Sequence, residues 1–169
     1  MIKSILAIAE VGFCCVGMRD LSDNYLRVVR FQETDAGGVV YFAELLGFCH
    51  EAYEDSLAKA GVDVRAFFSG SGLADEDGDQ LAIAVPIVHA EADFFKPMFC
   101  GDHISISLMP ARLTPNSFEV AYEVFSRDGQ KVAKALTRHV AIWVDSRRRC
   151  PLPKYLMRWI ADLVQSEVD

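Results

Sequence analysis

The longest periodic segment of the chain predicts an amphipathic helix from about Tyr41 to Ala60. Its apolar residues recur every three or four positions and acidic residues fill the opposite side, which is typical of a helix with one buried face. Gly61 follows directly and fits the end of this helix, because glycine readily adopts the left-handed conformation that caps a last turn. The apolar positions are Phe42, Leu45, Leu46, Cys49, Tyr53, Leu57 and Ala60.

Strand-like segments lie on both sides of this helix. Before it, Tyr25, Val28, Val29 and Phe31 indicate a strand within residues 24–32. After it, apolar and polar residues alternate with the two-residue period of half-buried strands. These later strands are expected at residues 81–95, 104–109, 118–125 and 131–144, with a closing helix at 155–164.

One long helix beside a mostly antiparallel sheet of about five strands defines the α+β class. The Asp128-Gly129 pair is a favoured hairpin turn, and we expect the four strands after the helix to follow one another in hairpin succession. No internal repeat or linker divides residues 25–169, so this range is interpreted as a single domain.

Two segments do not fit the alternation. Residues 1–24 form an N-terminal extension that is largely apolar but carries Glu10 and is too short to span a bilayer. We interpret it as a non-functional extension with Met18 as the true start; a secretory or anchoring segment and an extra packed element are the alternatives. Residues 69–80 are acidic and rich in glycine, a composition that cannot bury a core, so we expect a solvated insertion rather than a lid.

Composition narrows the classes of function. Apolar residues make up 51% and charged residues 24% of the chain, which indicates a globular protein. The net charge of −7 argues against a nucleic-acid partner, because binding along a phosphate backbone requires a basic face. A small basic patch for one phosphorylated ligand is compatible with this charge.

The cysteines and histidines carry no metal signature. Five cysteines stand at irregular spacing without a C-x-x-C pair, so neither a disulfide framework nor a zinc site is expected, and a cytoplasmic location fits best. The four histidines are scattered and form no H-E-x-x-H motif. We therefore expect no metal site. No bound cofactor and no membrane partner are expected either.

One carboxylate stands where a catalytic acid is useful. Asp35 lies in a turn with Gly37 and Gly38, directly before the predicted helix. The N-terminus of a helix offers unpaired backbone N–H groups and the positive end of the helix dipole, and acyl transfer requires an acid beside such donors. Asp35 is equally compatible with a capping role, since aspartate is common at helix starts.

Further motifs accompany this turn. They are Thr34-Asp35 with Gly38-Val39-Val40-Tyr41, Pro86-Ile87-Val88, Asp93-Phe94 with Pro97, and Gly101-Asp102. Together they resemble the hotdog fold and, within it, the 4-hydroxybenzoyl-CoA thioesterase family, over Tyr25 to Trp159. The resemblance implies a long central helix wrapped by the sheet. It also implies a homo-oligomer, a dimer or tetramer, because hotdog domains pair their sheets edge to edge and place the site at the subunit boundary.

A narrower likeness comes from longer phrases. They are Gly38-Val39-Val40-Tyr41-Phe42, Cys49-His50-Glu51-Ala52-Tyr53-Glu54, Val88-His89-Ala90, Asp93-Phe94-Phe95 and Cys100-Gly101-Asp102. They resemble the 1,4-dihydroxy-2-naphthoyl-CoA hydrolases of phylloquinone and menaquinone biosynthesis, which implies hydrolysis of that acyl-CoA to 1,4-dihydroxy-2-naphthoate and CoA. The alternatives are a hydrolase of 4-hydroxybenzoyl or fatty acyl thioesters, and a non-catalytic acyl-CoA-binding protein of the same fold.

The resemblance also implies roles at the turn. Asp35 would attack the thioester carbonyl or activate a water molecule, two routes that the sequence leaves open. The backbone N–H of Tyr41 or Phe42 would stabilise the oxyanion. Gly38 would let the substrate approach the backbone closely, since glycine has no Cβ atom.

Three further residues are assigned to the substrate. His50 and His89 would hydrogen-bond ring hydroxyls of the acyl group, with a structural role as the alternative for both. Arg148, in a run of three arginines, would contact the CoA phosphates, with a solvated charge run as the alternative. The basic cluster that precedes the fourth strand in the 4-hydroxybenzoyl enzymes is reduced here to one basic residue, Arg112.

Aromatic residues near these motifs suit a flat bicyclic acyl group, because aromatic rings stack and bury a large area. Any hydrophobic core needs such residues too, and the pattern alone favours the core. The residues are Tyr41, Phe42, Phe94, Phe95 and Phe99.

Overall fold

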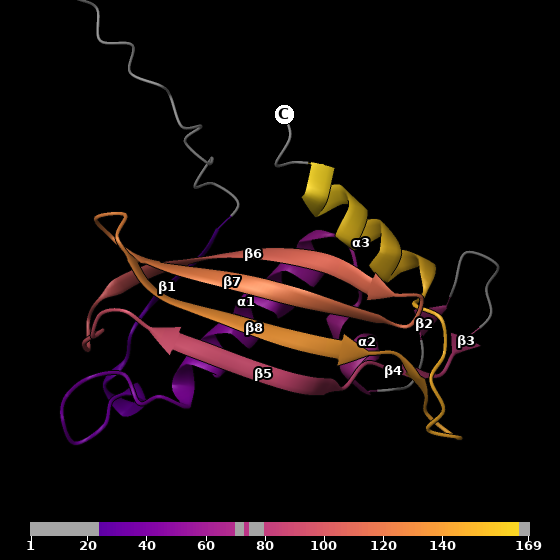
Figure 1. The fold of residues 1–169 in the computed structure, drawn as a ribbon, viewed down its shortest axis with the longest axis horizontal. Helices are drawn as coiled ribbons and strands as arrows, with labels where there is room; N and C mark the ends of the chain where they lie inside the picture. Colours follow the sequence, from indigo (N-terminus) through magenta and orange to yellow (C-terminus); the bar gives the residue numbers. More distant parts are fainter. Residues whose placement is uncertain (1–23, 70–72, 75–79, 166–169) are drawn as a thin grey trace, which may run out of the picture.

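A five-stranded antiparallel sheet forms the body of the structure (Figure 1). The computed structural model describes residues 24–69, 73–74 and 80–165. The strands run in the order β1-β6-β7-β8-β5, and with the helices they confirm the predicted α+β class. Their bounds are β1 (Tyr25–Val28), β5 (Ile87–Phe94), β6 (His103–Thr114), β7 (Ser117–Ser126) and β8 (Lys131–Val140).

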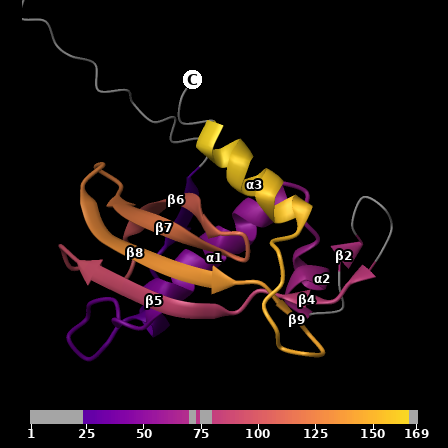
Figure 2. The same cartoon turned by 45° about the vertical axis from the view of Figure 1, so that its right-hand side comes forward.

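The predicted long helix is present as α1 (Glu44–Lys59) and runs along one face of the sheet (Figure 2). Its end is capped as expected. Gly61 has a φ of +79°, and the Val62 N–H donates to the Leu57 carbonyl oxygen at 3.0 Å, the bond of a Schellman motif. The helix begins at Glu44 rather than at Tyr41, because residues 41–43 form a turn.

The core lies between α1 and the sheet, and the burial of β7 shows how the sequence alternation produces it. Every second side chain of β7 is buried against the helix layer, as a pleated strand with one covered face requires. The helix α3 (Lys154–Gln165) closes the core, since the Trp159 ring lies 5.5 Å from the Tyr53 ring and 5.9 Å from the Phe118 ring. The buried β7 residues are Phe118, Val120, Tyr122 and Val124.

The predicted hairpin succession is wrong for its first member. β5 does not pair with β6 but with β8, in the register Ile87↔His139 to Phe94↔Ala133. The reason is that β1 already occupies the outer edge of β6, with Tyr25 opposite Ile106. β5 therefore takes the free edge of β8, and the long helix bridges the two edges of the sheet.

Three predicted strands are shorter than expected. The segment 81–95 is interrupted at Pro86, which lacks the N–H that a ladder needs, so its part after Ala82 divides into β4 (Ile83–Ala84) and β5. The segment 131–144 divides into β8 and β9 (Ile142–Trp143), and β9 pairs with β4 in a separate small sheet. The first strand ends at Val28, after which the chain enters the short 3-10 helix η2 (Phe31–Glu33).

Other predictions fall at the margins of the structure. The helix α2 (Val64–Ser69) was not expected. Most of the acidic loop 69–80 lies outside the described residues, as does the extension up to residue 23, so the domain limits at 24 and 25 stay a prediction. The short strands β2 (Leu73–Ala74) and β3 (Gln80–Leu81) pair at the ends of the loop. Within the described part of the chain, no helix is long and apolar enough to cross a membrane.

Candidate active site

Asp35 sits in a tight loop between η2 and α1, and backbone hydrogen bonds close that loop. The Asp35 N–H donates to the Val39 carbonyl at 2.8 Å, and the Gly38 N–H donates to the Asp35 carbonyl at 3.0 Å. The Asp35 side chain is held by its own turn, since Oδ1 accepts the Gly37 N–H at 2.7 Å. One carboxylate oxygen is thus fixed, and the side chain as a whole is exposed.

The two glycines of the loop have different reasons to be glycine. Gly38 has a φ of +78°, and no atom lies within 4 Å of the Cβ that a larger residue would add there. The backbone conformation, rather than crowding within the subunit, therefore selects glycine at this position. At Gly37 an added Cβ would lie 3.1 Å from Asp35 Oδ1, so any side chain there presses on the carboxylate.

The two predicted oxyanion donors, the N–H groups of Tyr41 and Phe42, differ in whether they are hydrogen-bonded within the fold. The Tyr41 N–H donates to the Glu33 carbonyl oxygen at 2.8 Å, so it is already used within the fold and is not available to a substrate oxygen. The Phe42 N–H has no hydrogen-bond partner among the described residues. Phe42 also stands at the turn before Glu44, the first residue of α1, where the helix dipole favours negative charge.

Asp35 and Phe42 share one cleft of about 400 Å³. The C-terminal end of β5 and the segment after it line the same cleft, through Phe94, Phe95 and Lys96. The volume falls within the range of small-molecule sites, and an apolar lining with a few convergent polar groups is typical of them. The lining residues are Asp35, Val39, Val40, Phe42, Phe94, Phe95, Lys96, Pro97 and Met98.

The aromatic residues singled out from the sequence are surface residues in the described structure. Tyr41, Phe42, Phe94, Phe95 and Phe99 are each at least 42% exposed. The interpretation of these rings as core is therefore wrong. Exposed apolar surface of this kind marks a binding site or an interface, and three of the rings line the cleft.

The two histidines assigned to the acyl group lie away from the cleft of this subunit. His50 is on α1 with its ring 5.3 Å from the Phe68 ring and its Nε2 3.2 Å from Glu54 Oε1. His89 is on β5 with its Nε2 3.3 Å from Glu91 Oε2. Neither side chain is buried, and neither lines the cleft, nor does Gly38.

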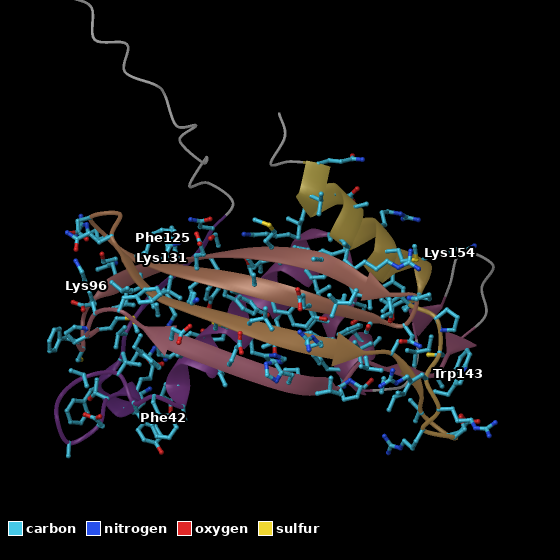
Figure 3. The ribbon with its side chains drawn as sticks, in the orientation of Figure 1. Phe42, Lys96, Phe125, Lys131, Trp143 and Lys154 are labelled. Atoms are coloured by element: carbon cyan, nitrogen blue, oxygen red, sulfur yellow. The ribbon has the colours of Figure 1, made fainter. Side chains whose placement is uncertain are left out.

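Arg148 lies at the other end of the sheet from Asp35. Its carbonyl accepts the Trp143 N–H at 2.9 Å, which fixes it beside β9, just after the end of β8. Figure 3 shows Phe42 and Lys96 at one end of the molecule and Trp143 at the opposite end. Within one subunit, the structure does not bring Arg148 and Asp35 together.

The structure adds a charged cleft residue that the sequence reasoning missed. Lys96 lines the cleft with Asp35, and its Nζ donates to the Gln130 side chain. The signal was present as one basic residue between Phe95 and Pro97 in an otherwise apolar stretch. A cation here places positive charge on the lining of the cleft.

The core contains a polar group that the sequence also did not reveal. His139 is buried, its ring stacked on Phe118 at 4.7 Å. Its Nε2 lies 2.9 Å from Thr137 Oγ1, which lies 3.2 Å from the Tyr122 hydroxyl. Burial, and to a smaller extent the charge of nearby His50, lowers the pKa of His139 to about 4. The ring is therefore neutral near pH 7 and belongs to the packing rather than to the cleft.

No metal centre stands out in the part of the chain that the structure describes, where no three histidine, cysteine or acidic side chains gather closely enough to bind an ion. The cysteines described there, Cys49, Cys100 and Cys150, are free thiols. Burial raises the pKa of Cys49 to about 12, so this thiol is protonated and unreactive near neutral pH.

A helix packed on a five-stranded sheet, with Asp35 and Phe42 lining one cleft, is the arrangement of a hotdog-fold hydrolase. Residues 29–160 match the thioesterase-like superfamily, and the chain belongs to that family. A solved structure, the 1,4-dihydroxy-2-naphthoyl-CoA thioesterase from Synechocystis, superimposes with a TM-score of 0.73 at 34% identity. The match covers 83% of this chain and 96% of that one.

Curated relatives agree with this assignment. The 1,4-dihydroxy-2-naphthoyl-CoA hydrolase of Thermosynechococcus vestitus is 43% identical over 146 residues, covering 86% of this chain and 93% of the relative. The hydrolase of the same name from Gloeothece citriformis is 46% identical over 145 residues, covering 85% and 94%. The similarity therefore spans nearly the whole of each relative.

Proposed function

We propose that this protein hydrolyses 1,4-dihydroxy-2-naphthoyl-CoA to 1,4-dihydroxy-2-naphthoate and CoA. The observation that carries the proposal is the cleft shared by Asp35, Phe42 and two further phenylalanines, Phe94 and Phe95. The names and identities of the relatives supply the acyl group. A flat bicyclic ring suits the faces of Phe94 and Phe95, since aromatic pairs prefer stacked or edge-to-face contact.

In the proposed mechanism the thioester carbonyl lies between Asp35 and the N-terminal turn of α1. The Phe42 N–H donates to the carbonyl oxygen as negative charge develops on it. Asp35 either attacks the carbonyl carbon, forming an anhydride that water then hydrolyses, or removes a proton from the attacking water. The thiolate of CoA leaves in both routes. Label that appears in the Asp35 carboxylate after a single turnover in oxygen-18 water identifies the anhydride route, because the enzyme carboxylate gains a water oxygen only when water opens the anhydride at the Asp35 carbonyl.

The proposal includes a dimer formed through β5. This strand is at the edge of the sheet, and it carries the exposed apolar residues Ile87, Val88 and Phe94. Soluble proteins normally cover an apolar edge strand of this kind. Antiparallel pairing of two β5 strands about a two-fold axis brings the Ile87 end of one beside the Phe94 end of the other. His89 and Arg148 of the partner subunit would then approach the cleft that holds Asp35.

The proposed location is the cytoplasm, because the irregular spacing of the cysteines does not fit a disulfide framework.

The remaining part of the proposal concerns the binding of CoA. Arg148 would bind its phosphates from the partner side, and Lys96 at the cleft offers a second cation. An arginine suits phosphate because its planar guanidinium donates two parallel hydrogen bonds.

The decisive experiment compares kcat/KM for the naphthoyl, 4-hydroxybenzoyl and long-chain acyl thioesters of CoA. We expect the naphthoyl substrate to be preferred, and Asp35→Asn to lower its kcat by at least ~10²-fold. Asp63→Asn is the matched control, because the exposed Asp63 side chain only caps α2 through the Ala66 N–H at 3.0 Å.

Two results would contradict the proposal in different ways. Preference for another thioester, with Asp35 still essential, would leave a thioesterase with a different substrate. Binding of the naphthoyl thioester without turnover, or an Asp35→Asn variant within a few-fold of wild type, would remove the catalytic role of the turn.

A further inference from the structure

An arginine of the first strand is enclosed at the base of the catalytic loop. Arg27 lies on β1 with only 7% of its side chain exposed, and its guanidinium stacks on the Phe48 ring at 3.6 Å. One Nη donates to Glu33, and the other donates to Glu51 Oε2 at 2.7 Å. A guanidinium that spans two carboxylates in this way is fixed in position and orientation.

Glu33 is the buried partner of this arginine and stands just before the loop. Its side chain is 12% exposed, and its Oε2 accepts the Arg30 N–H at 2.7 Å. Its backbone carbonyl accepts the Tyr41 N–H at 2.8 Å. Glu33 is therefore held through its side chain and in turn holds the far end of the loop through its main chain.

The Glu33–Tyr41 hydrogen bond closes the loop that carries Asp35. The next pair inward is the Thr34↔Val40 bridge, so Asp35 projects from a short two-stranded stem. Phe42 follows Tyr41 directly. A shift of Glu33 would thus move the carboxylate and the oxyanion donor relative to each other.

We propose that Arg27 and Glu33 form a positioning pair that sets the distance between the Asp35 carboxylate and the Phe42 N–H. The inference rests on the proposed function, because it assigns the pair to the geometry of the same reaction. Neither side chain lines the cleft. The pair acts on the transition state, in which both groups must meet one carbonyl, and much less on substrate binding.

The kinetic test uses the full chain and Glu33→Gln, which keeps the backbone carbonyl and the side-chain shape but removes the charge. We expect kcat to fall about 10- to 100-fold, as small misplacements of reacting groups do, with KM within about twofold of wild type. Lys59→Met is the control. It removes the cation of an exposed ion pair on α1, Lys59 with Asp55 at 2.8 Å. This variant should leave kcat and KM unchanged.

A double variant separates positioning from stability. Arg27→Met alone leaves Glu33 buried without its cation, which lowers the melting temperature. Arg27→Met with Glu33→Gln removes both charges, and we expect the melting temperature to recover while kcat stays low. Recovery of kcat together with stability would show that the pair only supports the fold. Should Arg27→Met not fold, kcat and the melting temperature are compared in Glu33→Gln and Arg27→Lys instead. A low kcat at an unchanged melting temperature then supports the positioning role.

Amide hydrogen exchange gives a readout that does not depend on the substrate. In Glu33→Gln we expect faster exchange of the Tyr41 and Asp35 N–H groups, with unchanged exchange in the middle of α1. Unchanged loop exchange with wild-type kcat would overturn the inference. A wild-type protein that hydrolyses no thioester would overturn the proposed function instead, and the exchange of the loop would still test the pair.

Discussion

Asp35 and Arg148 lie at opposite ends of the five-stranded sheet. Asp35 shares its cleft with Phe94, at the end of β5, whereas Arg148 is bonded to Trp143 beyond the end of β8. The eight residues of β5 span roughly 26 Å at about 3.3 Å per residue. In the proposed dimer, a two-fold axis beside β5 would turn this separation into proximity, because antiparallel pairing places opposite ends of the two β5 strands side by side.

The first prediction tests whether the two residues act across the subunit boundary. Asp35→Asn and Arg148→Gln each lower kcat/KM for the acyl-CoA, the first through chemistry and the second through weaker phosphate binding. In a mixed dimer of the two variants, one site combines both defects and the other has neither. Mixed dimers isolated with two affinity tags should therefore show about half of the wild-type kcat/KM.

The control is each variant carried through the same two-tag purification as a homodimer. Both should stay low. Mixed dimers no more active than these homodimers would mean that Asp35 and Arg148 serve within one subunit, or that Arg148 does not contact CoA.

The second prediction concerns the conformation of Gly38. Because its φ is +78° while no atom lies near an added Cβ, backbone strain should decide which residues it accepts. Gly38→Asn should keep most of the stability and activity, since asparagine tolerates the left-handed region, whereas Gly38→Val should lower both. Thermal melts and kcat measure this.

Gly47 provides the contrast for that experiment. It lies exposed within α1, and an added Cβ meets nothing within 4 Å. Gly47→Ala should stabilise the protein by up to about 1 kcal/mol through helix propensity. Equal tolerance of valine and asparagine at Gly38 would show that the turn does not need the observed backbone conformation.

The long helix, the closing helix and the alternating strands could be predicted because each carries its own periodicity. Gly61 marked the end of α1 correctly since capping is a local property. The placement of β5 could not be predicted in this way. It depends on β1 taking the edge of β6, which is a competition between segments far apart in the sequence and leaves no local signal.

The residues of the candidate site also differ in whether the local sequence reveals them. Asp35, its glycines and Phe42 are neighbours in the sequence, so one motif reveals them together. Lys96 joins them only through the path of the chain after β5, and the Arg27–Glu33 pair depends on β1 lying against α1. Such residues become visible only when the fold is known.

The third prediction concerns Lys96. Its position on the cleft suggests attraction of the anionic thioester rather than participation in the chemistry. Lys96→Gln should raise KM several-fold with little change in kcat, and the effect should shrink as added salt screens charge. Lys96→Arg should restore KM because it keeps the cation. A fall in kcat with constant KM would place Lys96 in the chemical step.

The last prediction concerns the stability of the core against acid. His139 has a pKa lowered to about 4, mainly by burial, whereas a histidine in the unfolded chain titrates near 6.5. The unfolded state therefore binds a proton first as the pH falls. Stability is present above about pH 6.5 and is lost as the pH falls toward 4.

Between pH 7 and pH 5 this linkage should cost about 2 kcal/mol of the free energy of unfolding. His139→Gln cannot titrate, so urea unfolding of this variant should show a pH dependence smaller by that amount, whatever its stability at pH 7. His103→Gln, which replaces an exposed histidine at the start of β6, should behave as wild type. An unchanged pH dependence in His139→Gln would mean that the buried ring accepts a proton without unfolding, and that the Thr137–Tyr122 network can accommodate the charge.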